Sequence, residues 1–131
     1  MNYKSFDNVK MKMIKKFNIT LGTIDEYDYK TDIILCNKHE YCDEYTKKFN
    51  KFKKYKCLEK KGDYCNGTIV YNKEPDCKCE VRHGFTIDSV QGITCEGRVY
   101  IDIRGMNSRG MRSLYTAVSR AKRWEQIVFI C

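Results

Sequence analysis

Short apolar runs constrain the fold of this chain more than any other feature. Residues 33–36, IILC, are apolar throughout, which suits a strand buried on both faces of a sheet. Residues 99–103, VYIDI, are typical of a strand, and residues 126–131, QIVFIC, are typical of a final buried strand. Helical patterns separate these runs. We therefore expect an α/β domain with a largely parallel sheet flanked by helices.

Three segments show the spacing of amphipathic helices. We expect helices at residues 5–17, 39–52 and 110–122. The second has one aromatic face, which we interpret as core, and a solvated lysine face formed by Lys47, Lys48, Lys51 and Lys54. Residues 55–80 are different, with short apolar stretches divided by glycine, asparagine and proline. This pattern predicts a small β-hairpin insertion.

The length of the chain indicates how many domains it forms, and its net charge indicates which kinds of partner it binds. With 131 residues the chain is expected to form a single domain, 1–131. The formal net charge is +8, from 25 Lys and Arg against 17 Asp and Glu. Such a balance favours partners that carry phosphate, such as nucleic acid or nucleotides.

The number and spacing of the cysteines help to predict the cellular compartment and whether the chain binds a metal ion. The chain has eight cysteines, no apolar run long enough to span a membrane and no signal-peptide core. We therefore expect a cytoplasmic or nuclear protein with reduced thiols and no membrane partner. Cys57, Cys65, Cys77 and Cys79 lack regular zinc-ligand spacing, so we expect no metal site. His39 and His83 are expected on the surface or in loops.

The third expected helix carries a positive edge that includes Arg120. A guanidinium on the polar side of a packed helix can stabilise charge that develops on a transferred phosphoryl group. The 131 residues contain no GxxxxGK[ST] phosphate loop, so this chain would supply only the other half of such a site. Ligands of parallel sheets bind at the carboxyl ends of the strands. The loop after Phe85 and Thr86 and the end of the 110–122 helix are therefore the expected positions of the site.

Two motifs resemble those of one enzyme family. TIDSVQG at residues 86–92 resembles motif V of superfamily 1 helicases, in the form of coronavirus-type enzymes. LYTAVSRAK at residues 114–122 resembles motif VI in the form of RecD-like helicases. Upstream, residues 33–49 resemble motif IV, a strand that ends in an asparagine, Asn37, and leads into a helix. The resemblance covers about residues 30 to 131 and implies a RecA-like fold.

The resemblance also implies roles for single residues. Arg120 matches the arginine finger of the family, and Gly92 matches the glycine whose backbone approaches the phosphates. Gln91 matches the glutamine that links the nucleotide site to the strand-binding surface. Thr94 stands where several relatives carry a glutamate that contacts the nucleotide. The positions that match contacts to single-stranded nucleic acid are Thr86, Asp88, Ser89 and Asn37.

The implied protein is the second motor domain of a helicase. ATP and Mg²⁺ would bind at its boundary with an N-terminal RecA-like domain of the same protein, which would supply the phosphate loop and the metal-binding carboxylate. The enzyme would move along single-stranded nucleic acid, DNA rather than RNA, from 5′ to 3′. The chain by itself would not hydrolyse ATP. Two alternatives are a non-catalytic nucleic-acid-binding module derived from a helicase half and a cysteine-rich zinc interaction protein.

Overall fold

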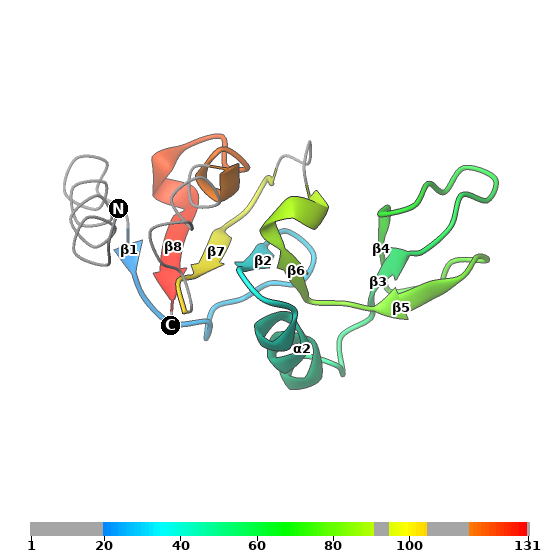
Figure 1. The fold of residues 1–131 in the computed structure, drawn as a ribbon, viewed down its shortest axis with the longest axis horizontal. Coiled ribbons are helices and arrows are strands. Elements are labelled where there is room, and N and C mark those ends of the chain that lie inside the picture. Colours follow the sequence, from blue (N-terminus) through cyan, green and yellow to red (C-terminus); the bar gives the residue numbers. More distant parts are fainter. Residues whose placement is uncertain (1–19, 91–94, 105–115, 131) are drawn as a thin grey trace.

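A parallel sheet forms the centre of the protein. The computed structural model describes residues 20–90, 95–104 and 116–130. The sheet has five strands in the order β1-β8-β7-β2-β6, and every pairing is parallel (Figure 1). Its strands are β1 Thr20–Leu21, β2 Ile33–Cys36, β6 Gly84–Thr86, β7 Val99–Asp102 and β8 Ile127–Ile130. The prediction of a largely parallel α/β sheet is confirmed.

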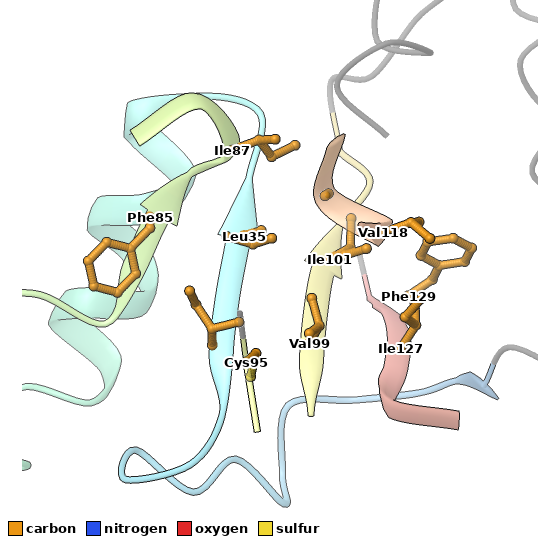
Figure 2. Packing of buried hydrophobic residues seen from close by; sticks show 11 residues of the cluster. Leu35, Phe85, Ile87, Cys95, Val99, Ile101, Val118, Ile127 and Phe129 are labelled. Atoms are coloured by element: carbon orange, nitrogen blue, oxygen red, sulfur yellow. The ribbon is translucent and has the colours of Figure 1, made fainter. Parts of the chain in front are cut away.

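The central strands are buried on both faces. All four residues of β2, β7 and β8 are buried. Ile33 and Leu35 of β2 belong to one apolar cluster, whereas Ile34 and Cys36 belong to a second on the other face. Figure 2 shows the first cluster, in which Leu35, Ile101 and Val118 meet. Two buried faces favour apolar residues, which explains the apolar runs. Asp102 of β7 is a buried exception that has hydrogen-bond partners.

Helix α2, His39–Lys48, covers the second face of the sheet. Its buried residues are Cys42 and Tyr45. The helix ends four residues before the predicted end at residue 52, and Phe49 caps it by donating its backbone N–H to the Tyr45 carbonyl. Lys54, expected on the solvated face of this helix, lies instead in strand β3 and is buried.

Residues 116–118 form a helical turn on the first face, where Ala117 and Val118 are buried. The prediction of helix through residue 122 is wrong at its end. Residues 119–120 form a turn, and Ala121 makes a parallel bridge with Cys95. The helix ends before this bridge, because the backbone at Ala121 cannot pair with Cys95 and continue the helix at the same time. Residues 105–115 and the predicted helix 5–17 lie outside the described residues.

A small antiparallel sheet lies beside β6, at the opposite end of the main sheet from β1 (Figure 1). Its strands are β3 Lys54–Cys57, β4 Ile69–Tyr71 and β5 Cys79–Val81, in the order β4-β3-β5. The predicted β-hairpin insertion is thus present as three strands. Two short 3-10 helices complete the described fold, η1 Ile87–Val90 and η2 Trp124–Gln126.

Within the parts of the chain that the structure describes, no helix is long and apolar enough to cross a membrane.

The contact between α2 and β6 depends on Gly84. A Cβ added there would lie 2.7 Å from both the Cα and the carbonyl oxygen of Cys42, so the backbone of helix and strand would have to separate. We expect Gly84→Ala to lower the free energy of unfolding by about 1–3 kcal/mol, as overpacking does. Urea unfolding followed by circular dichroism measures it.

Gly62→Ala is the comparison variant. A Cβ at Gly62 meets nothing within 4 Å, although its φ of 58° strains any other residue. Its cost is expected to stay near 1 kcal/mol. A Gly84→Ala protein as stable as the wild type would show that α2 and β6 do not pack this closely.

Candidate functional site

Arg120 lies in the turn that ends the helical segment on the first face of the sheet. The side chain is half-buried and folds back over its own turn. Its Nε donates to the Thr116 carbonyl at 3.2 Å, and its Nη2 donates to the Ser119 hydroxyl at 3.1 Å. Both acceptors are neutral.

Among the described residues, Arg120 has no carboxylate partner, whereas three other arginines do. Arg82 pairs with Asp43 at 2.7 Å, Arg98 with Glu26 at 2.5 Å, and Arg104 with Asp102 at 2.8 Å. A half-buried guanidinium without a counter-ion can bind an anionic ligand with two parallel hydrogen bonds.

The backbone of Arg120 pairs with the segment that follows TIDSVQG. The Cys95 N–H donates to the Arg120 carbonyl at 2.9 Å, next to the bridge between Cys95 and Ala121. Two segments that are 25 residues apart in the sequence, counted from 95 to 120, thus lie side by side. The structure thus places Cys95, three residues after the first motif, beside the end of the second motif.

Gln126 fixes this arrangement. Its buried side chain donates from Nε2 to the carbonyls of Cys95 at 3.1 Å and Gly97 at 2.5 Å. Its Oε1 accepts the backbone N–H groups of Lys122 and Arg123, both at 2.8 Å. One amide side chain therefore ties the two segments together. Sequence reasoning missed this role, because a single glutamine before an apolar strand belongs to no motif.

Arg120 lies at the amino-terminal edge of the sheet. Cys95 precedes β7, and its thiol donates to the carbonyl of Thr31, which precedes β2, at 3.3 Å. The expectation that Arg120 shares the carboxyl edge with Thr86 is wrong. The chain that links parallel strands β7 and β8 must return along the sheet, so its end reaches the amino-terminal edge.

The expected strand-contacting residues lie at the carboxyl edge. Thr86 ends β6 beside Cys36 of β2, and Asn37 follows immediately. Ser89 lies in η1, where its hydroxyl donates to the Thr86 carbonyl at 2.9 Å, and Asp88 belongs to the same short helix. The structure thus groups Thr86, Ser89 and Asn37. Gln91, Gly92 and Thr94 lie outside the described residues, and their roles stay predictions.

A second arginine cluster lies at the end of β7. Asp102 is fully buried and accepts the Tyr45 hydroxyl at 2.5 Å and the Arg104 Nε at 3.0 Å. Burial and the hydrogen bond to Asp102 raise the pKa of the Tyr45 phenol. Arg104 also pairs with Glu44 at 2.8 Å. Because two carboxylates neutralise Arg104, we interpret this cluster as structural.

A buried polar chain connects the small sheet with the main sheet. The Lys54 ammonium donates to the Tyr27 hydroxyl at 3.1 Å, Tyr27 bonds His83 Nδ1 at 2.8 Å, and His83 Nε2 bonds the Phe52 carbonyl at 3.1 Å. His83 lies in the loop between β5 and β6, as one of the two expected settings, but it is fully buried and therefore not a surface residue. Burial lowers the pKa of the His83 imidazole to about 4. His83 therefore accepts from Tyr27 and donates to Phe52 as a neutral ring.

The seven cysteines within the described residues are free thiols. Cys57 and Cys79 face each other across β3 and β5, and Cys65 and Cys77 lie in the adjoining loops. Within residues 20–90, 95–104 and 116–130, no three His, Cys, Asp or Glu side chains are placed to hold a metal ion.

Comparison with known proteins leaves the family open. No protein-family model matches the chain, and no curated protein matches it. The function must therefore be argued from the fold and from the two groups of residues at its edges.

Replacement of Gln126 tests how the two segments are held. Gln126→Leu leaves two carbonyls and two N–H groups without their partner, so we expect a loss of about 3 kcal/mol in the free energy of unfolding. Glu125→Ala, at an exposed position one residue earlier, should change it by no more than about 0.5 kcal/mol. Equal small effects in urea unfolding would contradict the role of Gln126.

His83 predicts a dependence of stability on pH. The unfolded chain binds a proton at His83 below its ordinary pKa of 6.5, whereas the folded protein binds it only near pH 4. Stability is therefore lost as the pH falls through this range, by about 2 kcal/mol between pH 6.5 and about pH 5. Unfolding by urea at several pH values measures the loss.

His83→Gln removes the titrating group but keeps an acceptor and a donor, so its stability should depend less on pH in this range. His39→Gln, at an exposed position, should behave as the wild type. A wild-type slope in His83→Gln would show that His83 is not the group responsible.

Proposed function

We propose that this chain is the second RecA-like motor domain of a superfamily 1 helicase. The observation that carries the proposal is the setting of Arg120. Its guanidinium has no carboxylate partner among the described residues, and its backbone pairs with the segment that follows TIDSVQG. The parallel sheet with helical segments on both faces agrees with a RecA-like fold.

ATP would bind between this domain and another that carries the phosphate loop. The 131 residues contain no such loop. The N-terminal RecA-like domain of the same protein would therefore cradle the phosphates and hold Mg²⁺, while this chain contributes Arg120 and the backbone at Gly92. Mg²⁺ supplies electrostatic stabilisation of the phosphate oxygens when it is bound. The chain by itself would not hydrolyse ATP.

The hydrogen bonds of Arg120 allow it to act as the arginine finger. To reach a γ-phosphate the guanidinium must release the Thr116 carbonyl and the Ser119 hydroxyl. Two neutral bonds are then exchanged for bonds to charged oxygens, which are roughly twice as strong. Because Arg120 breaks no ion pair, the exchange is favourable once ATP is present. Charge that develops on the phosphoryl group is then stabilised by a cation already in place.

The opposite edge would bind single-stranded nucleic acid. Thr86, Ser89 and Asn37 lie together there, and Asp88 belongs to the same 3-10 helix as Ser89. Thr86 lies at this edge and Cys95, nine residues later in the sequence, pairs with Arg120 at the other edge. A movement of Arg120 toward ATP would therefore reach the strand contacts through one short segment. We propose DNA as the strand, with translocation from 5′ to 3′ in the cytoplasm or nucleus.

A nucleic-acid-binding module without catalysis is the second candidate. The missing phosphate loop and the threonine at position 94, where several relatives carry glutamate, favour it. In that case the net charge of +8 serves binding alone.

Arg120 variants decide between the candidates. In a protein that contains both motor domains, Arg120→Ala should reduce strand-stimulated ATP hydrolysis by about 10³-fold or more. Arg120→Lys should restore little of it, since an ammonium lacks the planar bidentate geometry. Binding of single-stranded DNA without nucleotide should be unchanged. Phosphate release and fluorescence anisotropy measure the two quantities.

Arg123→Ala is the control, because Arg123 is exposed and lies one turn further along the chain. It should leave hydrolysis nearly unchanged. Arg120→Ala itself should cost no more than about 1 kcal/mol of stability, the value of its hydrogen bonds. Equal losses of hydrolysis in Arg120→Ala and Arg123→Ala would refute the arginine-finger assignment.

A further inference from the structure

A pocket of about 270 Å³ lies where the small sheet meets the main sheet. Ile69 and Tyr71 of β4 line one side, and Ile33 of β2 and Cys95 line the other; Lys30 and Lys54 also line this junction pocket. Sites for drug-sized ligands occupy about 300–1,000 Å³. The junction pocket therefore fits a single planar ring system rather than a whole nucleoside triphosphate.

Lys54 brings a buried cation to the junction pocket. The residue is 1% exposed, and its ammonium donates to the Asp32 carbonyl at 2.9 Å and to the Tyr27 hydroxyl at 3.1 Å. Burial lowers the pKa of Lys54 to about 8, so the amine is mostly protonated at neutral pH. A protonated amine has three N–H groups, and only two have oxygen acceptors among the described residues.

The Asp32 carboxylate makes no direct ion pair with Lys54 among the described residues, although its charge and that of Asp28 act to raise the pKa of Lys54. One of its oxygens accepts the Arg98 N–H at 2.7 Å, and the other accepts the Asp28 N–H at 2.8 Å. The Lys54 ammonium instead lies over three aromatic rings, at 5.4–5.9 Å from the ring centroids of Tyr27, Tyr71 and Phe85. A ligand with an oxygen acceptor would satisfy the third N–H group.

Tyr71 gives the junction pocket an exposed aromatic wall. The residue is 37% exposed. Asn72, in a left-handed conformation with φ of 69°, turns the chain directly after it and bonds the Tyr29 hydroxyl. Tyr29 in turn stacks on Phe52, with centroids 5.0 Å apart. The Tyr29 ring also lies 6.3 Å from the Tyr71 ring, at a tilt of 59°. A partly exposed aromatic ring at the wall of a pocket is a surface on which nucleobases can stack.

The surface around the junction pocket is basic. Lys30 lines the pocket and is exposed, and two further exposed lysines, Lys53 and Lys73, lie just before β3 and just after β4 in the sequence. Glu96, at the border of the pocket, is paired with Lys122 at 2.5 Å. Positive charge beside an exposed aromatic ring suits a sugar-phosphate backbone that delivers its base to the ring.

We propose that the junction pocket binds one nucleobase with a ring carbonyl oxygen, from a single strand that passes over the small sheet. The base stacks on Tyr71, its carbonyl accepts from the Lys54 ammonium, and the neighbouring phosphates contact Lys30. This inference rests on the proposed function only in taking single-stranded nucleic acid as the ligand. The pocket borders the amino-terminal edge of β2, whereas Thr86 and Asn37 lie at the carboxyl edge.

Oligothymidylate of about ten nucleotides is the probe, within the range of strand length that one such surface binds. An abasic oligonucleotide of the same length has the same phosphates and should bind about tenfold more weakly, because stacking of the base is lost. Tyr71→Ala should remove this difference, and Tyr71→Phe should keep it. Tyr64→Ala, in the loop between β3 and β4 and outside the pocket lining, is the control and should also keep it.

A second probe tests Lys54. Replacing thymine by difluorotoluene keeps the shape of the base but removes its carbonyl oxygens, so the wild type should bind that oligonucleotide less tightly than oligothymidylate. Lys54→Met should bind both alike. A cross-link from 5-iodouracil to Tyr71 would locate the base in the folded wild-type protein, whatever the stability of the variants.

Three results would overturn the proposal. They are equal affinity of the wild type for the thymidine and abasic strands, a cross-link that maps only outside the pocket, and thymidine monophosphate binding as tightly as the oligonucleotide. The last would indicate a mononucleotide site rather than a strand contact. All measurements use binding by this chain, so they are separate from the hydrolysis that tests Arg120.

Discussion

The burial of β2 and β7 on both faces is the constraint on which the rest of the structure depends. Parallel strands of this kind need cover on each side, and α2 and the 116–118 turn provide it. Parallel pairing also requires the chain to return along the sheet after each strand. The ends of the strands and the ends of the connecting segments therefore lie at opposite edges, and the two groups of candidate residues are separated for this reason.

The segment from Thr86 to Cys95 joins those two edges. At one end Thr86 and Ser89 are hydrogen-bonded beside Asn37; at the other, Cys95 pairs with Arg120 and is fixed by Gln126. Under the proposed function, this arrangement gives a physical link between a phosphate sensor and a strand contact. The two groups of residues are nine positions apart in the sequence, counted from Thr86 to Cys95.

Much of the fold could be predicted because it depends on periodicity. The apolar runs correctly indicated buried parallel strands, and the short apolar stretches divided by glycine, asparagine and proline correctly indicated a small β insertion. The burial and the hydrogen-bond partners of single polar residues could not be predicted. Lys54 and His83 are buried, although lysine and histidine spacing resembled a solvated surface, because each finds hydrogen-bond partners from segments far along the chain. The role of Gln126 in joining two segments was missed for the same reason. The edge of the sheet at which Arg120 lies was missed as well.

The Nε resonances of the arginines test the central claim most directly. In protein labelled with ¹⁵N-arginine and joined to its phosphate-loop domain, a non-hydrolysable ATP analogue with Mg²⁺ should shift the Arg120 Nε–H signal, since this group exchanges the Thr116 carbonyl for a phosphate oxygen. The Arg104 signal should stay in place, because Asp102 holds that guanidinium. An unchanged Arg120 signal with the analogue bound would contradict the account.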